Sequence, residues 1–593
     1  MCSMRVGLCV AVLFCCALGE IVAQDSNAVV VSGSVGMSFD SYTMTSTGIT
    51  STFARRPATV MRFSADPTIS IGDWFTIPII VSCTFREAAV IQPSFNYPDV
   101  MSFLQNPMNR ISISPRYEWA TLNLGSITPR YGTFTVDNAQ LFGAGIDLAP
   151  GVLRASASYG ILYRAVPADT STGQSGSYER TLWAIRLGSQ SEDQSVIGLT
   201  VAYMNDDQSS IPQILQSTTI PVPILDSNGL VLRDSLYSFT ERNALLGKPQ
   251  EGVALGMDFK SHIGESFQVS GEIAAVGFTR DKSASPLTDQ LPVISEILTT
   301  RTSTSMDVAA KLDASYRDET WGINVGALYA GPGFVALSQP FFQPDRIDIS
   351  VSPNVRLFDG KISASSTFGY RISDVSNMLT AGSTQILLSL NVIATLSDAF
   401  NIGGSYTNFG YRTTRAADTL RYEQVSNSIS ITPSYSITAN ELRHVFSGSF
   451  SNDAFSDVTQ LNIASSANTT TAVTLLYSIS PLKSSWVGRA TVSIVQNNLQ
   501  SSSISMKSGT VSGSYRAFDG QLEPDVALVY SLNELSGLPA ESQITVRAGC
   551  RARPIESINL FANAQWTRVT SADVTTGRAY SELIGTLGFR WSF

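Results

Sequence analysis

The chain has 593 residues, of which 43% are hydrophobic and only 15% are charged. Charged residues at this frequency are scarce for a soluble chain, whereas Ser, Thr, Gly and Tyr are abundant. The formal net charge of −9 gives no electrostatic basis for binding nucleic acid, so we expect no nucleic-acid partner.

Residues 1–23 have the pattern of a cleaved signal peptide. Arg5 closes a short basic segment, residues 6–18 form an apolar stretch that is too short to span a bilayer, and residues 21–23 offer a cleavage site before Gln24. An uncleaved membrane anchor is the alternative, but no charged cytoplasmic tail follows. We therefore expect residues 24–593 to be exported.

The exported part reads as strands of about ten residues. In residues 153–161, 253–260 and 486–494, apolar side chains take every second position, and mostly polar or small ones lie between them. A period of two places one face of a strand against an apolar phase and the other against a polar phase. Tight turns, such as 149–151 and 517–520, alternate with longer polar connections. This alternation is typical of outer-membrane barrels, with short periplasmic turns and longer external loops.

These patterns predict an all-β fold, a single large antiparallel transmembrane β-barrel of about 26 strands, within a range of 22–26. We count 22 strands from Trp119 onward. Four more strands fall in the N-terminal part, 24–116, near Ala28–Phe39, Thr59–Ala65, Trp74–Phe85 and Arg110–Ser114. A barrel of this girth is too wide for its own side chains to fill. Water or a folded-in segment must occupy the lumen, and we expect residues 205–248 to form a long external or lumen-filling loop.

Charged side chains of both signs take the inward positions of the predicted strands. The lumen-facing candidates are Arg154, Arg186, Arg371, Arg489, Arg547, Arg551, Arg590, Asp258, Glu272, Asp313, Asp525 and Glu582. One hypothesis is an arginine ladder that selects anionic solutes. The other is a hydrated wall whose charges cancel locally, because a buried unpaired charge is costly.

No set of residues points to catalysis, a metal or a cofactor. His262 and His444 both lie beside predicted periplasmic turns, whereas outer-membrane hydrolases act near the outer rim. No CxxC motif or His-rich cluster suggests a metal site. Cys83 and Cys550, the two cysteines of the exported part, lie on apolar faces, and we expect lipid contact there rather than a disulfide. We therefore expect no enzyme and no cofactor.

The last strand carries a resemblance. Phe589, Trp591 and Phe593 lie on one face and end the chain. This end resembles the C-terminal signal of Gram-negative outer-membrane β-barrel proteins. The resemblance implies location in the outer membrane, contact with its lipid, and recognition by the outer-membrane assembly machinery.

A second likeness covers about a tenth of the chain. Residues 109–119, with the sequence NRISISPRYEW, and 141–151, with the sequence LFGAGIDLAPG, are similar to large outer-membrane proteins of the Bacteroidetes–Chlorobi type. It implies no defined activity. The chain departs from TonB-dependent receptors, because no plug of the expected length precedes the first strand near Ala28.

The function that we expect is a porin-like channel or passive transporter for small solutes. One alternative is a structural or secretion-related barrel that binds a partner protein through its external loops. A second is an outer-membrane enzyme. A third is a transporter of hydrophobic substrates, for which inward Ile80, Leu182 and Phe561 would line an apolar pocket. An open lumen would conduct, and a plugged one would not.

Overall fold

The computed structural model describes residues 29–46, 55–86, 109–168, 175–211, 215–225, 231–242, 247–288, 297–379, 381–414, 422–457, 467–483, 485–571 and 579–593. The predicted signal peptide, 1–23, lies outside the described residues. Among those residues, no helix combines the length and apolar character needed to cross a membrane.

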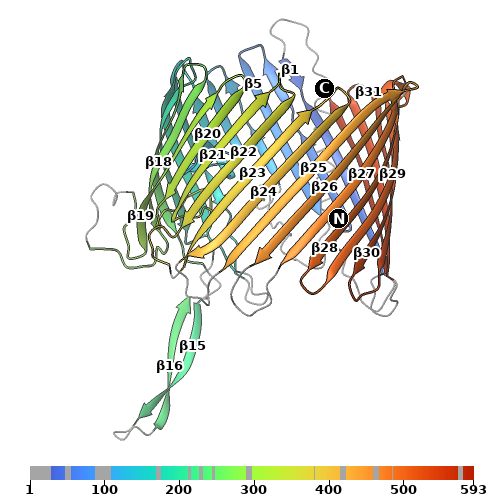
Figure 1. Ribbon diagram of the computed structural model, residues 1–593. Coiled ribbons are helices and arrows are strands. Elements are labelled where there is room, and N and C mark those ends of the chain that lie inside the picture. Colours follow the sequence, from blue (N-terminus) through green and yellow to red (C-terminus); the bar gives the residue numbers. More distant parts are fainter. Residues whose placement is uncertain are drawn as a thin grey trace.

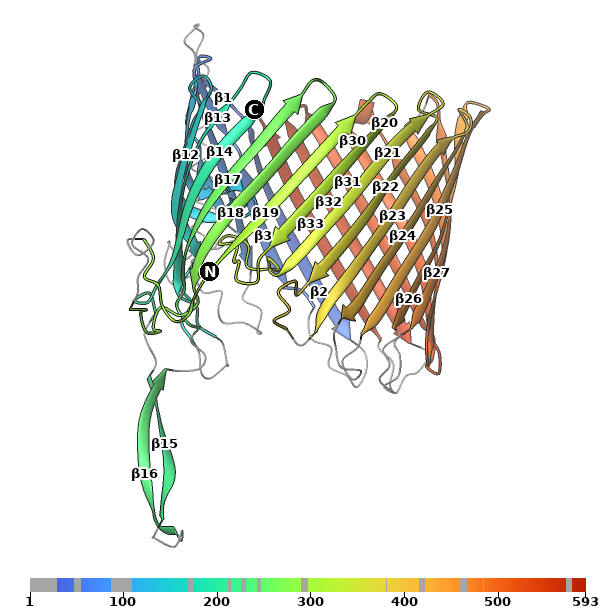
Figure 2. The same cartoon turned by 60° about the vertical axis from the view of Figure 1, so that its left-hand side comes forward.

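Antiparallel strands form one continuous ring of tilted strands (Figures 1 and 2). Its first half contains β2 (Ser34–Ser46), β3 (Thr59–Ala65), β5 (Phe75–Arg86), β6 (Arg110–Ile113), β8 (Ala120–Ile127), β11 (Leu141–Leu148), β12 (Leu153–Tyr163), β13 (Glu179–Gln190), β14 (Val196–Asp207), β17 (Glu251–Ile263), β18 (Phe267–Thr279), β19 (Thr304–Arg317) and β20 (Trp321–Ala330). The second half contains β21 (Arg346–Leu357), β22 (Ile362–Ser373), β23 (Gly382–Thr395), β24 (Phe400–Thr414), β25 (Glu423–Ala439), β26 (Leu442–Asp457), β27 (Asn468–Pro481), β28 (Trp486–Leu499), β29 (Ser503–Tyr515), β30 (Leu522–Leu535), β31 (Glu541–Ile555), β32 (Ile558–Ser571) and β33 (Tyr580–Ser592).

Three short segments continue strands of the ring after a break. They are β1 (Val29–Ser32), β4 (Thr68–Ile71) and β7 (Arg116–Tyr117). The 29 segments of the sheet therefore make a closed barrel of 26 strands, which confirms the predicted fold and strand number. The break before β2 is at Gly33, whose φ of +142° favours glycine and where a Cβ would stand 2.4 Å from the carbonyl oxygen of Asp66.

The barrel closes between its first and last strands. β2 pairs with β33 from Ser34 opposite Ser592 to Ser46 opposite Tyr580. Beyond this ladder, the backbone N–H of Gly33 donates to the carbonyl of Phe593 at 2.9 Å, and the N–H of Phe593 donates back at 3.0 Å. Closure leaves no edge strand, which is the condition for a β-sheet to span a membrane.

The two rims of the barrel differ. One rim, here the short-turn rim, carries tight connections such as 318–320 and 440–441, and the C-terminus lies there (Figure 1). The other, the long-loop rim, carries connections such as 164–178 and 331–345. The short 3-10 helix η3 (Phe518–Gly520) lies in a connection of the short-turn rim.

Alternate side chains of the strands face lipid and lumen. On β13, β14 and β17, the outward Leu187, Leu199 and Leu255 are about half exposed, whereas the inward Ala184, Ala202 and Ala254 are fully buried. An even number of tilted antiparallel strands with an apolar outer belt is the architecture of bacterial outer-membrane barrels. The chain is thus a transmembrane barrel of the Gram-negative outer-membrane type, as predicted.

Two hairpins lie outside the ring. β9 (Arg130–Gly132) and β10 (Val136–Asp137) form a small hairpin in the connection from β8 to β11. β15 (Leu215–Leu225) and β16 (Val231–Arg242) form a long hairpin within the predicted segment 205–248. This hairpin extends away from the long-loop rim in both views (Figures 1 and 2). Among the described connections, 127–141, which contains the small hairpin, and 331–345 pack against the inner wall.

Candidate functional site in the lumen

The connection 127–141, here the inward segment, folds onto the inner wall of the barrel. Phe134 and Val136 have no exposed surface. They belong to a small hydrophobic core together with Ile127, Tyr131, Ala139 and Leu141. Its remaining members come from the inward positions of β13, β14 and β17 to β20 and from 331–345: Leu182, Ala184, Ala202, Met204, Ala254, Ala274, Val276, Phe278, Ala309, Ala330, Phe334, Ala336 and Leu337. The ring of Phe134 meets those of Phe334 and Phe342 edge-on, at centroid distances of 5.7 and 6.0 Å. One side of the wide lumen is thus covered by packed apolar groups.

Polar contacts hold the same segment in register. The Glu272 carboxylate on β18 accepts hydrogen bonds from the backbone N–H groups of Thr133, at 2.7 Å, and Phe134, at 2.8 Å. Ser338 accepts a hydrogen bond from the backbone N–H of Asp137 at 3.0 Å. All three bonds satisfy backbone donors that would be costly to leave unpaired, and the two to Glu272 are charge-assisted.

An ion pair lies at the base of the segment. Arg186 on β13 binds Asp258 on β17 through two bonds of 2.6 Å, and its Nη1 also donates to the backbone carbonyl of Tyr131. Tyr131 itself is buried, and burial raises the pKa of its phenol to about 12. At Tyr131, the inward segment is therefore held by an ion pair at its backbone carbonyl and by burial of its neutral phenol.

The structure brings together only three of the twelve predicted lumen-facing charges. Arg186, Asp258 and Glu272 meet under the inward segment, and Arg154, which donates to Gln190 at 3.1 Å, lines the same cavity. The other eight are spread around the ring.

Most of those eight bind a neighbour that the sequence patterns did not single out. Arg371 pairs with Asp348 at 2.6 Å, Asp313 with Lys311 at 3.0 Å, Arg551 with Glu523 at 3.6 Å, and Arg590 with Asp66 at 3.6 Å; Glu582 accepts from Tyr42 at 2.9 Å, and Arg547 donates to Gln565 at 3.0 Å. Arg489 stands between Ser478 and Ser512 on its neighbouring strands. Asp525 shares a cavity of about 250 Å³ with Arg551. The geometry is a dispersed set of charges rather than one row.

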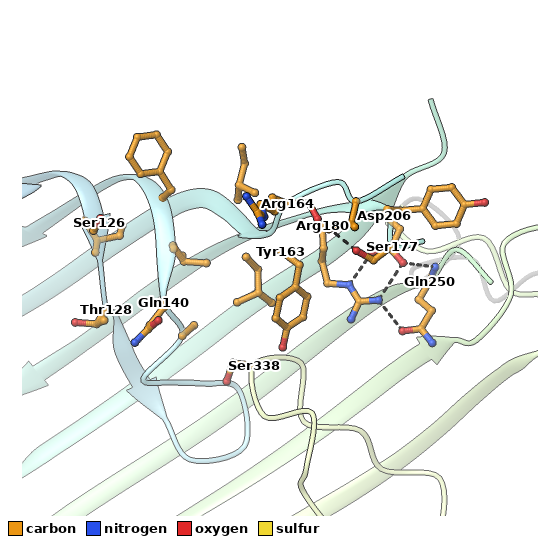
Figure 3. Close-up of a pocket in the computed structure, with 18 of the residues that line it drawn as sticks. Ser126, Thr128, Gln140, Tyr163, Arg164, Ser177, Arg180, Asp206, Gln250 and Ser338 are labelled. Carbon is orange, nitrogen blue, oxygen red and sulfur yellow. Dashed lines mark hydrogen bonds and ion pairs between the residues drawn. The ribbon is translucent and has the colours of Figure 1, made fainter. Parts of the chain in front are cut away.

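Two larger cavities flank the inward segment. One, of about 700 Å³, lies toward the short-turn rim and is lined by Arg154, Arg186, Asp258 and Glu272, among others. The other, of about 760 Å³, lies toward the long-loop rim and is shown in Figure 3. Its wall includes Tyr163, Arg180 and Asp206. The inward segment therefore separates two chambers on this side of the lumen. The cavity toward the short-turn rim is the inner chamber, and the cavity toward the long-loop rim is the outer chamber.

Hydroxyl groups line part of the wall in β21 to β28. Side chains on neighbouring strands bond in pairs: Ser352 with Thr367 at 3.1 Å, Ser405 with Ser430 at 2.7 Å, Ser434 with Ser447 at 3.2 Å, and Thr474 with Ser493 at 2.9 Å. The sequence patterns pointed to charges and missed this wall. Its signal was the run of alternate serines at 426–436.

The residues considered for a hydrophobic-substrate pocket or for catalysis lie apart from one another. Leu182 is buried beneath the inward segment, Ile80 lines the inner chamber, and Phe561 lines the small cavity near Arg551. They form no common apolar pocket. His262 contacts Gln268 at 3.1 Å and His444 contacts Tyr477 at 2.8 Å, both at the short-turn rim.

Cys83 and Cys550 are both free thiols. Within the described part of the chain, no group of three or more His, Cys, Asp or Glu side chains could hold a metal ion.

The predicted assembly signal lies at the closing seam. Phe589 stands opposite Met37 and Leu560, and Trp591 opposite Val35 and Ile558. The rings of Trp591 and Phe593 lie 4.8 Å apart.

No family model and no curated protein matches this chain. Among solved structures, OmpT of Vibrio cholerae is 11% identical, with 68% of this chain and 99% of that one covered and a TM-score of 0.24. Pseudomonas aeruginosa OccK9 (OpdG) is 8% identical over 67% of this chain and 98% of that one, with a TM-score of 0.28. The translocation pore of the P pilus usher PapC is 10% identical over 94% and 99%, with a TM-score of 0.24. At this level of similarity, function must be argued from the chain's own geometry.

Proposed function

We propose that this barrel is a passive, porin-like channel for small hydrophilic solutes. The observation that carries the proposal is the asymmetry of the lumen. The inward segment and residues 331–345 pack on β13 to β20, whereas the inner face of β28 to β31 keeps exposed polar side chains such as Arg489, Arg547 and Arg551. A ring of 26 strands is wide enough to hold an aqueous path beside these segments.

The wall of that path suits hydrated solutes. Hydroxyl pairs and locally paired charges offer hydrogen bonds without a large net field, so solutes would meet low barriers. This supports the second of the two hypotheses about the inward arginines, a hydrated wall with local pairing. No catalytic role is proposed: His262 contacts Gln268 and His444 contacts Tyr477, both away from the lumen cavities.

Single-channel recording tests this function. The exported part, 24–593, is reconstituted into a planar lipid bilayer. We expect steady current steps in the nanosiemens range, and swelling of liposomes that contain the protein when small sugars are added. A properly folded barrel that gives neither current nor swelling would overturn the proposal.

A second candidate is a barrel that binds a partner protein outside the cell. The β15–β16 hairpin favours it, because its eleven cross-strand pairs extend beyond the rim (Figure 1). Deleting 212–246 would leave current steps unchanged in a channel. A partner-binding barrel would instead lose capture of its partner by the same deletion.

A further inference from the structure

The outer chamber differs in charge from the inner one. The inner chamber balances Arg110, Arg130, Arg154 and Arg186 against Asp137, Asp147, Asp258 and Glu272. Among the described residues that line the outer chamber, Arg110, Arg164, Arg180 and Lys248 stand against one acidic residue, Asp206. None of the twelve predicted lumen-facing charges lines it. The outer chamber is therefore an electropositive cavity in a chain whose net charge is negative.

Arg180 is held rigidly in the wall of this chamber. Its Nε and Nη2 atoms bind the two carboxylate oxygens of Asp206 at 2.6 and 2.9 Å, and Nη2 also donates to Gln250 at 2.7 Å. The backbone N–H of Gln250 donates to Asp206 at 2.8 Å, and the ring of Tyr163 lies 5.4 Å from the guanidinium (Figure 3). Among the described residues, Nη1 of Arg180 has no partner, so it remains a preorganised donor.

Two other arginines line the chamber, Arg110 and Arg164. Among the described residues, their guanidinium groups have no side-chain hydrogen bond or ion pair. Lys248, by contrast, pairs with Asp281 at 3.0 Å outside the set that lines the chamber. Arginine is the side chain best suited to bind a planar carboxylate through two parallel bonds.

The chamber also has an apolar side. Ile127, Ala139 and Leu141 are buried there as part of the inward segment and its flanks, and Leu162 packs against them. Its volume of about 760 Å³ lies within the range of pockets that bind small organic molecules, which are largely apolar with a few convergent polar groups.

We propose that the outer chamber is a binding site for small organic anions, specifically carboxylates with an apolar body. The carboxylate meets Arg164, Arg110 and the free edge of Arg180, and the apolar body lies against Ile127, Leu141 and Leu162. The inference rests on the proposed function, since it names the class of solute that would pause at this entrance before passing the inward segment.

Binding is measured on the full exported chain in detergent, with benzoate as the probe and benzamide as its neutral counterpart. Isothermal titration should show saturable binding of benzoate and none of benzamide at the same concentrations. Arg164→Gln and Arg110→Gln should each weaken benzoate binding roughly tenfold, the loss of one charge-assisted contact. Arg164→Lys, which keeps the positive charge, should bind benzoate more tightly than Arg164→Gln.

Arg489→Gln is the matched control, because Arg489 faces the lumen on β28 but lies outside the chamber. It should leave benzoate affinity unchanged. Equal binding of benzamide and benzoate, an equal loss in Arg489→Gln, or no benzoate binding by the folded barrel would overturn the site. Folding of each variant is checked by the heat-dependent shift in electrophoretic mobility.

Bilayer recording separates this inference from the proposed function. Benzoate added on the long-loop side should interrupt the current through the natural protein and not through Arg164→Gln. A channel that conducts but binds no benzoate overturns the site and leaves the channel standing. A barrel that binds benzoate in detergent but passes no current overturns the channel and leaves the site.

Discussion

Arg186 and Asp258 bind each other across a strand that separates them. Arg186 is on β13 and Asp258 on β17, with β14 between, and both of their bonds measure 2.6 Å. The pair passes over Gly198, where a Cβ would lie 2.5 Å from Nη2 of Arg186 and 2.9 Å from Oδ1 of Asp258. A side chain at this position would therefore displace the ends of Arg186 and Asp258 and disturb their ion pair.

Gly198→Ala should displace the Arg186 guanidinium and weaken its hold on the Tyr131 carbonyl. Loss of a partly exposed pair of this kind costs about 1–3 kcal/mol, between the values for surface and buried pairs. We expect larger or more variable single-channel conductance, as the inward segment leaves the wall more often. Gly509→Ala, on the outer face of β29 where a Cβ would meet no atom within 4 Å, should leave conductance nearly unchanged; an equal effect of both variants would contradict this role for Arg186.

Phe134→Ala should release the inward segment without opening the barrel. Phe134 is fully buried between the wall and residues 331–345, and removing such a ring costs about 3–5 kcal/mol. The backbone ladders of the ring do not depend on it. Hydrogen–deuterium exchange followed by mass spectrometry should become faster in residues 130–137 and stay slow in β24 to β27.

The control for this change is Phe446→Ala. Phe446 is 48% exposed on the outer face, so its loss should leave exchange in 130–137 at the natural rate. Slow exchange of 130–137 in Phe134→Ala would show that polar contacts alone hold the segment.

Alkaline pH should loosen the same segment through Tyr131. Burial raises the pKa of this phenol from 10.0 to about 12. Because the pKa is higher in the folded state, the neutral phenol favours docking fully below pH 10, and this contribution of about 2–3 kcal/mol is lost as pH rises from 10 through 12. The difference in absorbance at 295 nm between the natural protein and Tyr131→Phe should titrate near 12. Titration of that difference near 10 would mean that the ring is hydrated.

The assignment of alternate side chains to the lipid and lumen faces can be tested by placing a lysine at either of two positions of β32. Leu560 is 42% exposed on the face that carries Phe589, whereas Asn563 lies on the opposite face, where its amide oxygen and Asp525 flank Gly549. Leu560→Lys should cost about 2–4 kcal/mol in the free energy of unfolding in lipid if it lies near the bilayer midplane, and Asn563→Lys far less. Denaturant titrations of both variants in the same lipid give the comparison, and equal costs would refute the assignment of faces.

The sequence specifies the ring well and the lumen poorly. A period of two depends only on residues within a strand, and the alternation of turns depends only on neighbours, so strand number and facing follow from local patterns. The inward segment depends on contacts between positions 134 and 334, which no local period encodes. A signal was present in Leu182, Ala184 and Ala202, which are apolar at inward positions where a wet wall would be polar.

The sequence patterns did not give the ion-pair partners of the inward charges, for a related reason. The period of two within a strand assigns each side chain to the lipid or the lumen face. The partner of a charged side chain depends instead on the register between strands. Asp348 and Glu523 therefore appear as partners of Arg371 and Arg551 only once β21 and β30 are aligned with their neighbours. Of the arginines of the outer chamber, Arg164 lies in a connection, where no period of two assigns a face; Arg110 and Arg180 lie on β6 and β13 and were not singled out.

Phe593 should affect insertion into the outer membrane more than the stability of the folded barrel. Its backbone N–H and carbonyl close the seam with Gly33, and these bonds do not require the ring, which contacts Trp591 at 4.8 Å. Phe593→Ala should therefore keep the unfolding free energy of protein refolded into lipid within about 1 kcal/mol of the natural value, the usual range for a half-exposed substitution. In cells, the same change should lower the amount of folded barrel in the outer membrane several-fold if the terminal aromatic is read by the assembly machinery. Normal amounts in the membrane would rule out that reading, and a barrel that fails to refold even in pure lipid would assign Phe593 a structural role instead.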